Sequence, residues 1–250
     1  MSRKNGFHAR WGLGRPRAIG YDRWMRETSS PVTSRQVEPH PRLVKTVQKH
    51  RDFPWRKPIA DHSRETFAVL APRVERWSGP WILDTGCGTG AGTAALALRN
   101  PVALVLGIDK SADRLARSAG LPSNALVTRM DLEDFWLLAR QAGWKFSLQC
   151  FFYPNPWPKP EQRLRRWPFH PVLPTVLACG SAWEVRTNWE VYAQEFSLAY
   201  AALTGEQTPV EPWNPEVPDT LFEKKYRESG HSLWRWRSPG AIGEGPGPRP

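Results

Sequence analysis

Residues 81–90 read WILDTGCGTG, and the α/β organisation of this chain of 250 amino acids can be worked out from them. A short apolar run from Trp81 to Leu83 leads into Asp84 and then into glycine at every second position. An Ala- and Leu-rich segment, residues 91–100, follows directly. Glycine lets the backbone turn sharply and lets a ligand approach it closely, and a helix start offers free N–H groups. The stretch predicts a strand, a turn and a helix, and either a tight βα turn or a nucleotide-type ligand accounts for the glycines.

The same alternation continues along the chain. Apolar runs at residues 102–108, 125–130 and 146–152 are separated by amphipathic segments at 111–120 and 131–143. Apolar runs of this kind are typical of buried parallel strands, and alternation with helices implies a sheet covered on both faces. We therefore expect a Rossmann-like α/β fold with a doubly wound, mostly parallel sheet.

Flanking segments extend this pattern in both directions. A helix is expected from residue 61 to 77, with Pro72 as a kink or a boundary. Further helices are expected within residues 173–180 and 189–203, and strands within 181–187 and 232–238.

Acidic side chains follow three of the predicted strands, namely Asp84, Asp109 and Asp131. In an open α/β sheet, ligands bind at the carboxyl ends of the strands. Asp109 has the distance from Gly86 at which a carboxylate binds the two hydroxyls of a ribose. Asp131 could accept a hydrogen bond from an adenine amine or could cap the next helix.

Glycine spacing separates two classes of nucleotide site. The glycines are Gly86, Gly88 and Gly90, which is a GxGxG pattern and not the GxGxxG of dinucleotide-binding enzymes. A nicotinamide oxidoreductase is thereby disfavoured. With Asp84 in front, the loop resembles motif I of class I S-adenosylmethionine-dependent methyltransferases. That resemblance implies S-adenosylmethionine as cofactor, with the three glycines and Asp84 at its methionine end, Asp109 at the ribose and Asp131 at the adenine.

Charge and composition point to a polyanionic partner. The chain carries 35 Lys and Arg against 24 Asp and Glu, a formal charge of +11, and it has 14 Trp and 25 Pro. Seven of the basic residues lie between Ser2 and Arg26. We expect residues 1–60 to be a basic, partly irregular arm that either folds on a polyanion or stays disordered. Residues 61–238 would form the methyltransferase domain, and residues 239–250 a disordered Gly/Pro tail.

Several classes of protein are disfavoured by what the sequence lacks. No apolar run approaches the roughly 18 residues of a membrane helix, and the N-terminus has no apolar signal region. The three cysteines are far apart, and neither they nor the six histidines have the spacing of metal ligands. We expect a cytoplasmic protein with no metal and no membrane partner.

A Pro- and Trp-containing loop follows the fourth predicted strand, where such folds place residues that face the substrate. Its sequence from Tyr153 to Lys159 is YPNPWPK, and Trp157 could stack on a flat base. A solvated loop is the alternative for the cations in and after it. Those cations are Lys159, Arg163, Arg165 and Arg166.

Three segments together resemble one family. Residues 151–167 (FFYPNPWPKPEQRLRRW) are similar to the F-P-D-P-W-x-K…K-R-R signature of the bacterial tRNA (guanine-N7-)-methyltransferases, the TrmB family. Residues 187–193 (TNWEVYA) resemble its T-D-W-x-x-Y-A motif. Residues 220–223 (TLFE), followed by Gly230 and His231, resemble its T-K-F-E…G-H segment. The resemblance extends over roughly residues 61–237.

The resemblance implies methyl transfer from S-adenosylmethionine to N7 of a guanosine in the variable loop of tRNA, by a monomer or a homodimer. Asn155 and Asn188 stand where the family has acids that bind substrate or cofactor and take part in catalysis, and Leu221 replaces a lysine. Both asparagines would orient guanine, and Thr220 and Glu223 would close the substrate pocket. The four cations named above and Trp157 would contact RNA.

Other functions stay open on the sequence. A catalytically impaired paralogue that binds tRNA without methylating it would suit the two asparagines. A methyltransferase acting on another RNA or on a small molecule would retain the glycine loop. We expect the asparagines to reduce or retune the enzyme, because an amide oxygen accepts a hydrogen bond more weakly than a carboxylate does.

Overall fold

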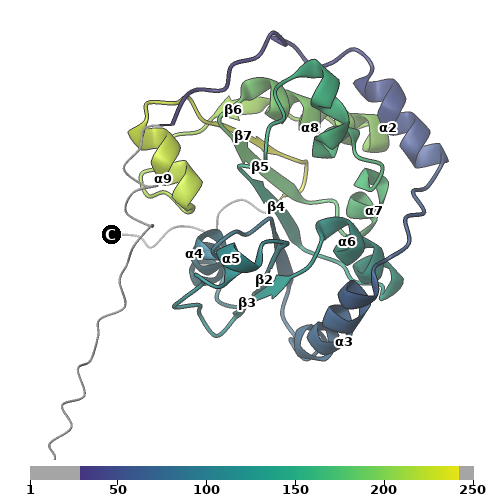
Figure 1. Ribbon diagram of the computed structural model, residues 1–250, viewed down its shortest axis with the longest axis vertical. Helices are drawn as coiled ribbons and strands as arrows, with labels where there is room; N and C mark the ends of the chain where they lie inside the picture. The colour runs from purple at the N-terminus through teal and green to yellow at the C-terminus, as the bar shows by residue number, and fades with distance from the viewer. Residues whose placement is uncertain (1–28, 242–250) are drawn as a thin grey trace, which may run out of the picture.

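The computed structural model describes residues 29–241, in which one seven-stranded sheet runs through the centre of the molecule (Figure 1). The strand order is β3-β2-β1-β4-β5-β7-β6. Strands β1 to β5 are parallel, and β7 is antiparallel to both of its neighbours. The strands are β1 Trp81–Thr85, β2 Leu104–Asp109, β3 Ala125–Arg129, β4 Leu148–Phe152, β5 Trp183–Thr187, β6 Val210–Pro212 and β7 Trp234–Arg237.

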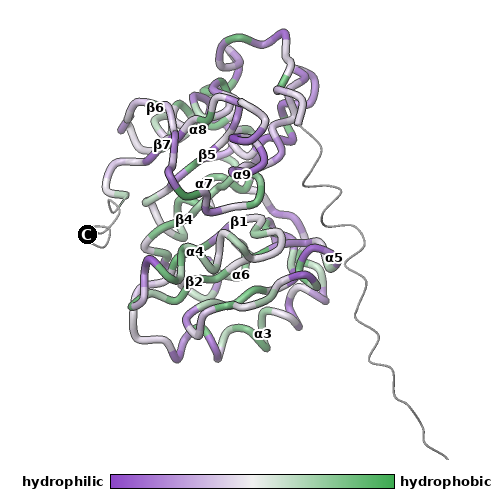
Figure 2. Tube along the Cα trace, turned by 90° about the vertical axis from the view of Figure 1, so that its left-hand side faces the viewer, coloured by the Kyte–Doolittle hydropathy of each residue, from purple (hydrophilic) through white to green (hydrophobic). Residues whose placement is uncertain are grey.

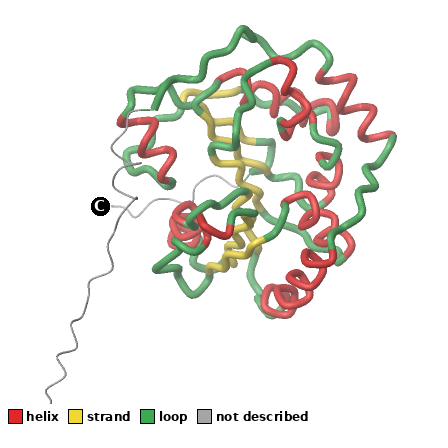
Figure 3. Tube along the Cα trace, viewed as in Figure 1, coloured by secondary structure: helices red, strands yellow, loops and turns green. Residues whose placement is uncertain are grey.

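Helices cover both faces of the sheet (Figure 3). On one face lie α3, α6, α7 and α8, with α2 packed outside α8, and on the other lie α4, α5 and α9 (Figure 1). The α-helices are α2 Leu43–Asp52, α3 Asp61–Glu75, α4 Ala91–Arg99, α5 Ala112–Leu115, α6 Leu132–Gln141, α7 Leu173–Ala178, α8 Glu190–Thr204 and α9 Leu221–Glu228. Two 3-10 turns, η1 Pro160–Arg165 and η2 Trp167–Phe169, follow the Pro-Trp loop.

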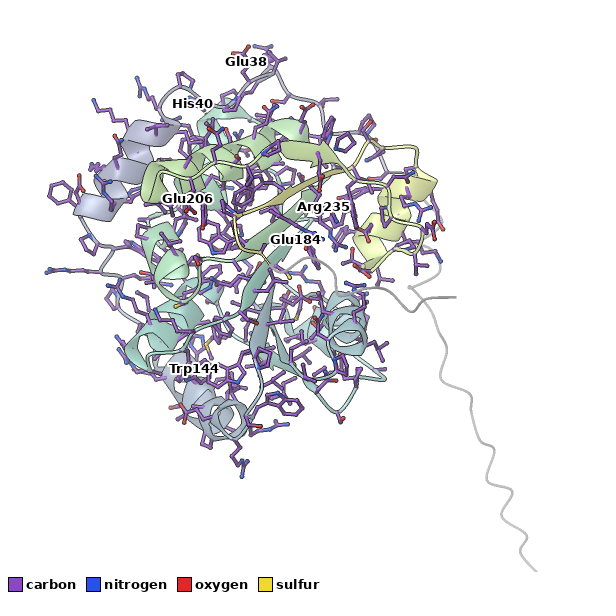
Figure 4. All side chains as sticks on the ribbon, turned by 180° about the vertical axis from the view of Figure 1, so that it is seen from behind. Glu38, His40, Trp144, Glu184, Glu206 and Arg235 are labelled. Atoms are coloured by element: carbon purple, nitrogen blue, oxygen red, sulfur yellow. The ribbon has the colours of Figure 1, made fainter. Side chains whose placement is uncertain are left out.

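Apolar residues gather in the central strands, as Figure 2 shows for β1, β2 and β4. Every residue of β2 is buried, which accounts for its uninterrupted apolar sequence. At the opposite end of the sheet from the strand carboxyl ends, aromatic rings fill the space between α3 and α6. Trp144 stands there 4.6 Å from the ring centre of Phe67 and 6.2 Å from that of Phe135 (Figure 4).

The structure confirms the expected fold class and corrects several details of the elements. Pro72 does not bound α3, which continues to Glu75, because a proline in the last turn removes only one helical hydrogen bond. The helix expected within residues 111–120 is a single turn, Ala112–Leu115. An ambiguous apolar pattern near residue 43 forms the regular helix α2.

The described part of the predicted arm is bound to the domain. Leu43 and Val47 of α2 are buried against α8. In front of α2, the Ser34 hydroxyl donates to the Pro158 carbonyl at 2.6 Å, and His40 lies close to α2 at the edge of the molecule (Figure 4). The basic run from Ser2 to Arg26 lies outside the described residues, as does most of the Gly/Pro tail. The division into arm, domain and tail therefore stays a prediction.

Candidate functional site

The carboxyl ends of β1, β2 and β4 open onto two adjoining cavities. The smaller has a volume of about 340 Å³ and lies between the glycine loop and the start of α9. The larger has a volume of about 800 Å³ and extends from the end of β2 to the Pro-Trp loop. Both cavities are lined by Gly86, Arg114, Phe152 and Phe222. The predicted cofactor and substrate residues are thus brought to one edge of the sheet.

The glycine loop adopts a backbone that favours glycine at alternate positions. Gly86, Gly88 and Gly90 have φ angles of 71°, 60° and 78°, in the left-handed region that other residues rarely occupy. The N–H groups of Gly86 and Cys87 both donate to the Ile108 carbonyl at the end of β2. This ties the loop to the sheet and leaves the start of α4 facing the smaller cavity.

Asp84 lies under the loop with only 3% of its surface exposed. Its Oδ2 accepts a hydrogen bond from the Thr93 hydroxyl of α4 at 2.6 Å. Burial raises the pKa of the Asp84 carboxyl to about 6, although the Thr93 bond opposes this shift. A cation placed in the smaller cavity would compensate the buried carboxylate, and the ammonium group of a bound amino acid is such a cation.

Asp109, at the end of β2, is already engaged by the protein. Gly88 N–H donates to its Oδ2 at 2.9 Å, and Ser111 N–H donates to its Oδ1 at 2.8 Å. The Arg114 guanidinium forms an ion pair with Oδ1 at 2.9 Å. Ribose hydroxyls at this carboxylate would therefore share it with Arg114, a residue that the sequence pattern did not single out.

Asp131 occupies the N-cap position of α6, but its side chain makes no capping hydrogen bond. The structure thus disfavours the alternative in which the Asp131 side chain caps helix α6. Its side chain lines the larger cavity together with Met130 and Leu132. An acidic acceptor beside two apolar side chains suits the amine and the ring of an adenine.

These residues fit S-adenosylmethionine. The buried Asp84 carboxylate, which forms no ion pair among the described residues, matches an ammonium group, and Asp109 and Asp131 match the ribose and the adenine amine. Asp84, Gly86, Gly88, Asp109 and Asp131 would hold the cofactor. Gly90 acts differently from the other two glycines, since it is the N-cap of α4 and a side chain there would approach Ser118 Oγ at 2.8 Å.

The Pro-Trp loop forms the outer wall of the larger cavity. Asn155 is exposed, and its Oδ1 accepts a hydrogen bond from Trp157 N–H at 3.3 Å. Tyr153 and Trp157 both have positive φ angles, 52° and 44°. The Arg165 guanidinium lies 4.7 Å from the centre of the Trp157 ring. Asn155, Trp157 and Arg165 all line the cavity, as expected for residues that receive a flat base.

The four predicted RNA-binding cations have different environments. Lys159 and Arg165 are exposed, and Arg163 is half-buried with its guanidinium donating to the Pro160 carbonyl. Arg166, by contrast, is completely buried and forms an ion pair with Glu195 at 2.8 Å. The prediction that Arg166 contacts RNA phosphates is therefore wrong, because its charge is compensated inside the protein.

Thr220 and Glu223 both stabilise the start of α9. Thr220 is the N-cap, its hydroxyl accepts from Glu223 N–H, and it lines the smaller cavity. Glu223 is fully buried and accepts hydrogen bonds from Tyr153 Oη and Trp213 Nε1, each at 2.8 Å. Thr220 thus borders the smaller cavity, at the glycine loop, and not the larger cavity in which the substrate is expected. Glu223 cannot contact a substrate and instead anchors α9 to the residue after β4.

Asn188 follows β5 and is half-buried. Its Nδ2 lies 3.1 Å from His231 Nδ1, and neither cavity is lined by it. The structure therefore does not bring Asn188 into the wall of the cavity in which it is expected to orient guanine. Within residues 29–241, no group of three or more His, Cys, Asp or Glu residues has the geometry of a metal site, and no helix is long and apolar enough to cross a membrane.

The sheet order, the glycine loop after β1 and the acids at the strand ends define a class I methyltransferase. A solved structure named "Structure of an antibiotic related Methyltransferase" shares this fold with a TM-score of 0.51 and 16% identity, over 72% of this chain and 96% of that one. A family model described as "Putative methyltransferase" matches residues 78–236.

Comparison with two relatives identifies the family within the methyltransferases. The tRNA (guanine-N(7)-)-methyltransferase of Neisseria meningitidis serogroup C (strain 053442) is 31% identical over 166 residues, which are 62% of this chain and 69% of the relative. The tRNA (guanine-N(7)-)-methyltransferase of Yersinia pestis (strain Pestoides F) is 25% identical over 207 residues, which are 77% of this chain and 85% of the relative. The chain belongs to the tRNA (guanine-N7-)-methyltransferase family, as its motifs predict.

Proposed function

We propose that the protein transfers the methyl group of S-adenosylmethionine to N7 of a guanosine in tRNA, with a guanosine of the variable loop as the expected target. The observation that carries this proposal is the pair of adjoining cavities, which share Gly86, Arg114, Phe152 and Phe222. A donor bound at the glycine loop and a base bound at the Pro-Trp loop would meet where the two cavities adjoin.

Methyl transfer to guanine N7 requires little acid–base chemistry from the side chains. When bound, S-adenosylmethionine supplies an electrophilic methyl group. Guanine N7 carries an in-plane lone pair and no proton, so no residue has to act as a general base at N7. The protein has to align the two reactants and exclude water. Phe152 and Phe222 would provide the apolar wall, while Asn155 and Asn188 would orient guanine by accepting from its N1–H and N2–H groups.

Recognition of tRNA would depend on the remaining exposed cations. Lys159 and Arg165 are exposed, Arg165 lines the larger cavity, and Arg163 is half-buried. The chain as a whole carries a formal charge of +11. Phosphate contacts release counterions, so we expect tRNA affinity to fall steeply between low and moderate salt. A nearly flat salt response would contradict a polyanion as partner.

Methyl transfer to defined RNA provides the direct test. The protein is incubated with S-adenosylmethionine and an unmodified tRNA transcript, and the digested nucleosides are separated by mass spectrometry. A 7-methylguanosine signal is expected. A matched transcript in which adenosine replaces the variable-loop guanosine should give no signal, and a signal of equal size would contradict that position.

Two other outcomes would identify the alternatives. Binding of both cofactor and tRNA without a methylated product would indicate a catalytically impaired tRNA-binding paralogue. Absence of tRNA affinity, with cofactor binding retained, would indicate another RNA or a small-molecule substrate. A tRNA substrate also implies the cytoplasm as the place of action, and a monomer or homodimer stays the predicted assembly.

A further inference from the structure

A chain of two hydrogen bonds links Ser29, His231 and Asn188. His231 Nε2 lies 2.8 Å from the Ser29 carbonyl oxygen, and His231 Nδ1 lies 3.1 Å from Asn188 Nδ2. The imidazole is stacked on the ring of Tyr226, with the ring centres 5.1 Å apart and the planes at 14°. Contacts at both nitrogens and on one face therefore fix the orientation of the imidazole.

The partners determine where the protons lie. A carbonyl oxygen can only accept, so His231 Nε2 must carry the proton that it shares with Ser29. In the neutral ring, Nδ1 then has a lone pair and accepts from Asn188. The NH2 end of the Asn188 amide must face the imidazole, and the carbonyl oxygen Oδ1 must face away from it. This assignment follows from the Ser29 carbonyl together with a neutral imidazole, and it needs no assumption about the amide itself.

The outward Asn188 oxygen is available to a ligand. Among the residues that the structure describes, none donates a hydrogen bond to Asn188 Oδ1. Asn188 follows β5, the strand paired with β4, and β4 leads into Asn155 of the larger cavity. Tyr226, on which His231 stacks, also lines that cavity.

We propose that His231 is a positioning residue that holds the Asn188 amide with its carbonyl oxygen toward the guanine. This inference rests on the proposed function and names a specificity determinant for it. A free amide has two orientations of similar energy, and only one of them presents an acceptor to guanine N1–H and N2–H. His231 selects that orientation, so the neutral Asn188 acts as an acceptor only, as a carboxylate would.

An acid at this position would interact with His231 differently. A carboxylate can only accept, so Asn188→Asp would require a proton on His231 Nδ1 in addition to the one on Nε2. The imidazole would then be doubly protonated and positively charged. Asn188 and the neutral tautomer of His231 therefore form a matched pair.

Two substitutions of His231 separate this role from a purely structural one. In His231→Asn, the amide can supply an acceptor near the Nδ1 position but loses the contact with Ser29. In His231→Gln, the longer amide can retain the donor near the Nε2 position but loses the acceptor for Asn188. Both variants lose the stacked ring to the same extent.

Kinetics with tRNA compare the two variants. Loss of one neutral hydrogen bond that orients the substrate corresponds to about a tenfold loss, so we expect kcat/KM to fall about tenfold in His231→Gln. His231→Asn should stay within about threefold of the unchanged protein. Equal losses in the two variants, or a larger loss in His231→Asn, would overturn the proposal, because the contact with Ser29 would then be the one that matters.

A spectroscopic measurement tests the arrangement without substrate. The ¹⁵N chemical shifts of the imidazole distinguish the two neutral tautomers and the doubly protonated ring. The His231 signals, identified by their loss in His231→Asn, should be those of the Nε2–H tautomer at neutral pH. At the same pH, Asn188→Asp should show a larger doubly protonated fraction.

The two readouts can fail independently. An Nδ1–H tautomer in the unchanged protein, or an unaltered ring in Asn188→Asp, would overturn the proposal whatever the activity. The expected signals together with an absence of methyl transfer to tRNA would leave the arrangement correct and refute the proposed function alone.

Discussion

Arg166 and Glu195 form an ion pair at 2.8 Å in which both side chains are completely buried. The Arg166 guanidinium also donates to the carbonyl of Trp157 and to the side chain of Gln36. It lies 4.7 Å from the centre of the Trp189 ring. The pair therefore connects the Pro-Trp loop, the segment in front of α2 and helix α8.

Arg165 and Arg166 are adjacent in sequence but should differ in their contributions to stability and to tRNA binding. Arg166→Ala removes the cation that pairs with the buried Glu195 carboxylate and should lower the free energy of unfolding by about 3–5 kcal/mol. The carboxylate then keeps the neutral donors Gln36 Nε2 and His40 N–H. Arg165→Ala removes an exposed charge and should change it by less than about 0.5 kcal/mol, while weakening tRNA binding. Urea unfolding and salt-dependent tRNA binding measure the two effects. Equal stability of the two variants would refute this assignment.

Cofactor binding should depend on pH through Asp84. Burial raises the pKa of this carboxyl to about 6, and only its ionised form attracts the cofactor ammonium. Affinity for S-adenosylmethionine should be highest near pH 7, where Asp84 is ionised and the cofactor's α-amino group is still protonated, and should fall about tenfold per pH unit below pH 6. Calorimetric titrations between pH 5 and 8 measure this dependence.

Asp84→Asn is the control for that experiment, because its amide does not titrate. The variant should bind the cofactor more weakly at high pH and should show no decline below pH 6. A decline that persists in Asp84→Asn would mean that another group is responsible.

The third prediction concerns Asn155, whose Oδ1 accepts from Trp157 N–H. Asn155→Asp retains this acceptor and adds a charge, so the loop should keep its shape while the bond to guanine becomes stronger. We expect kcat/KM for tRNA to rise about tenfold. Asn155→Ala removes the acceptor and should lower kcat/KM by a similar factor. Losses in both variants would show that position 155 does not accept from guanine.

Gly107 of β2 lies directly beneath the glycine loop. A Cβ at this position would lie 2.5 Å from Thr93 Oγ1 and 2.9 Å from Cys87 Sγ. Gly107→Ala should therefore displace Thr93 from Asp84, lower the free energy of unfolding by about 1–3 kcal/mol and weaken cofactor binding. Calorimetry and urea unfolding measure both quantities.

Gly143 provides the matched control for Gly107. It has a φ of 72°, and a Cβ there would meet no other atom within 4 Å. Gly143→Ala should lower stability by about 1 kcal/mol through backbone strain alone and leave cofactor affinity unchanged. Equal loss of cofactor affinity in both variants would show that displacement of Thr93 is not the cause.

The sheet, and the edge of it at which the cofactor residues lie, could be predicted from the sequence because both depend on local patterns of residues. Buried parallel strands such as β2 require uninterrupted apolar runs, and a GxGxG turn requires the φ angles that Gly86 and Gly88 adopt. Each of these signals lies within a few neighbouring residues. The ordered motifs around Asn155 and Asn188 then identified the family.

Contacts between distant residues could not be predicted in this way. Arg166 looks like its exposed neighbour Arg165 until Glu195, on another helix, is brought beside it. Glu223 matches a substrate motif but is buried by Tyr153 and Trp213. His231 receives its role from Ser29, about two hundred positions away along the chain. In each case the partner is determined by packing and not by local sequence.

The positive φ angles of Tyr153 and Trp157 imply a trade-off between stability and recognition. An L-residue in this region is less stable than glycine by roughly 1–2 kcal/mol, so glycine at either position would relieve strain. Tyr153 recovers part of this through its bond to buried Glu223. Trp157 forms hydrogen bonds through its backbone, to Asn155 and Arg166, while its ring lies beside the Arg165 guanidinium. The folded chain alone gives little reason for a tryptophan there, and its benefit would come when a nucleotide is bound.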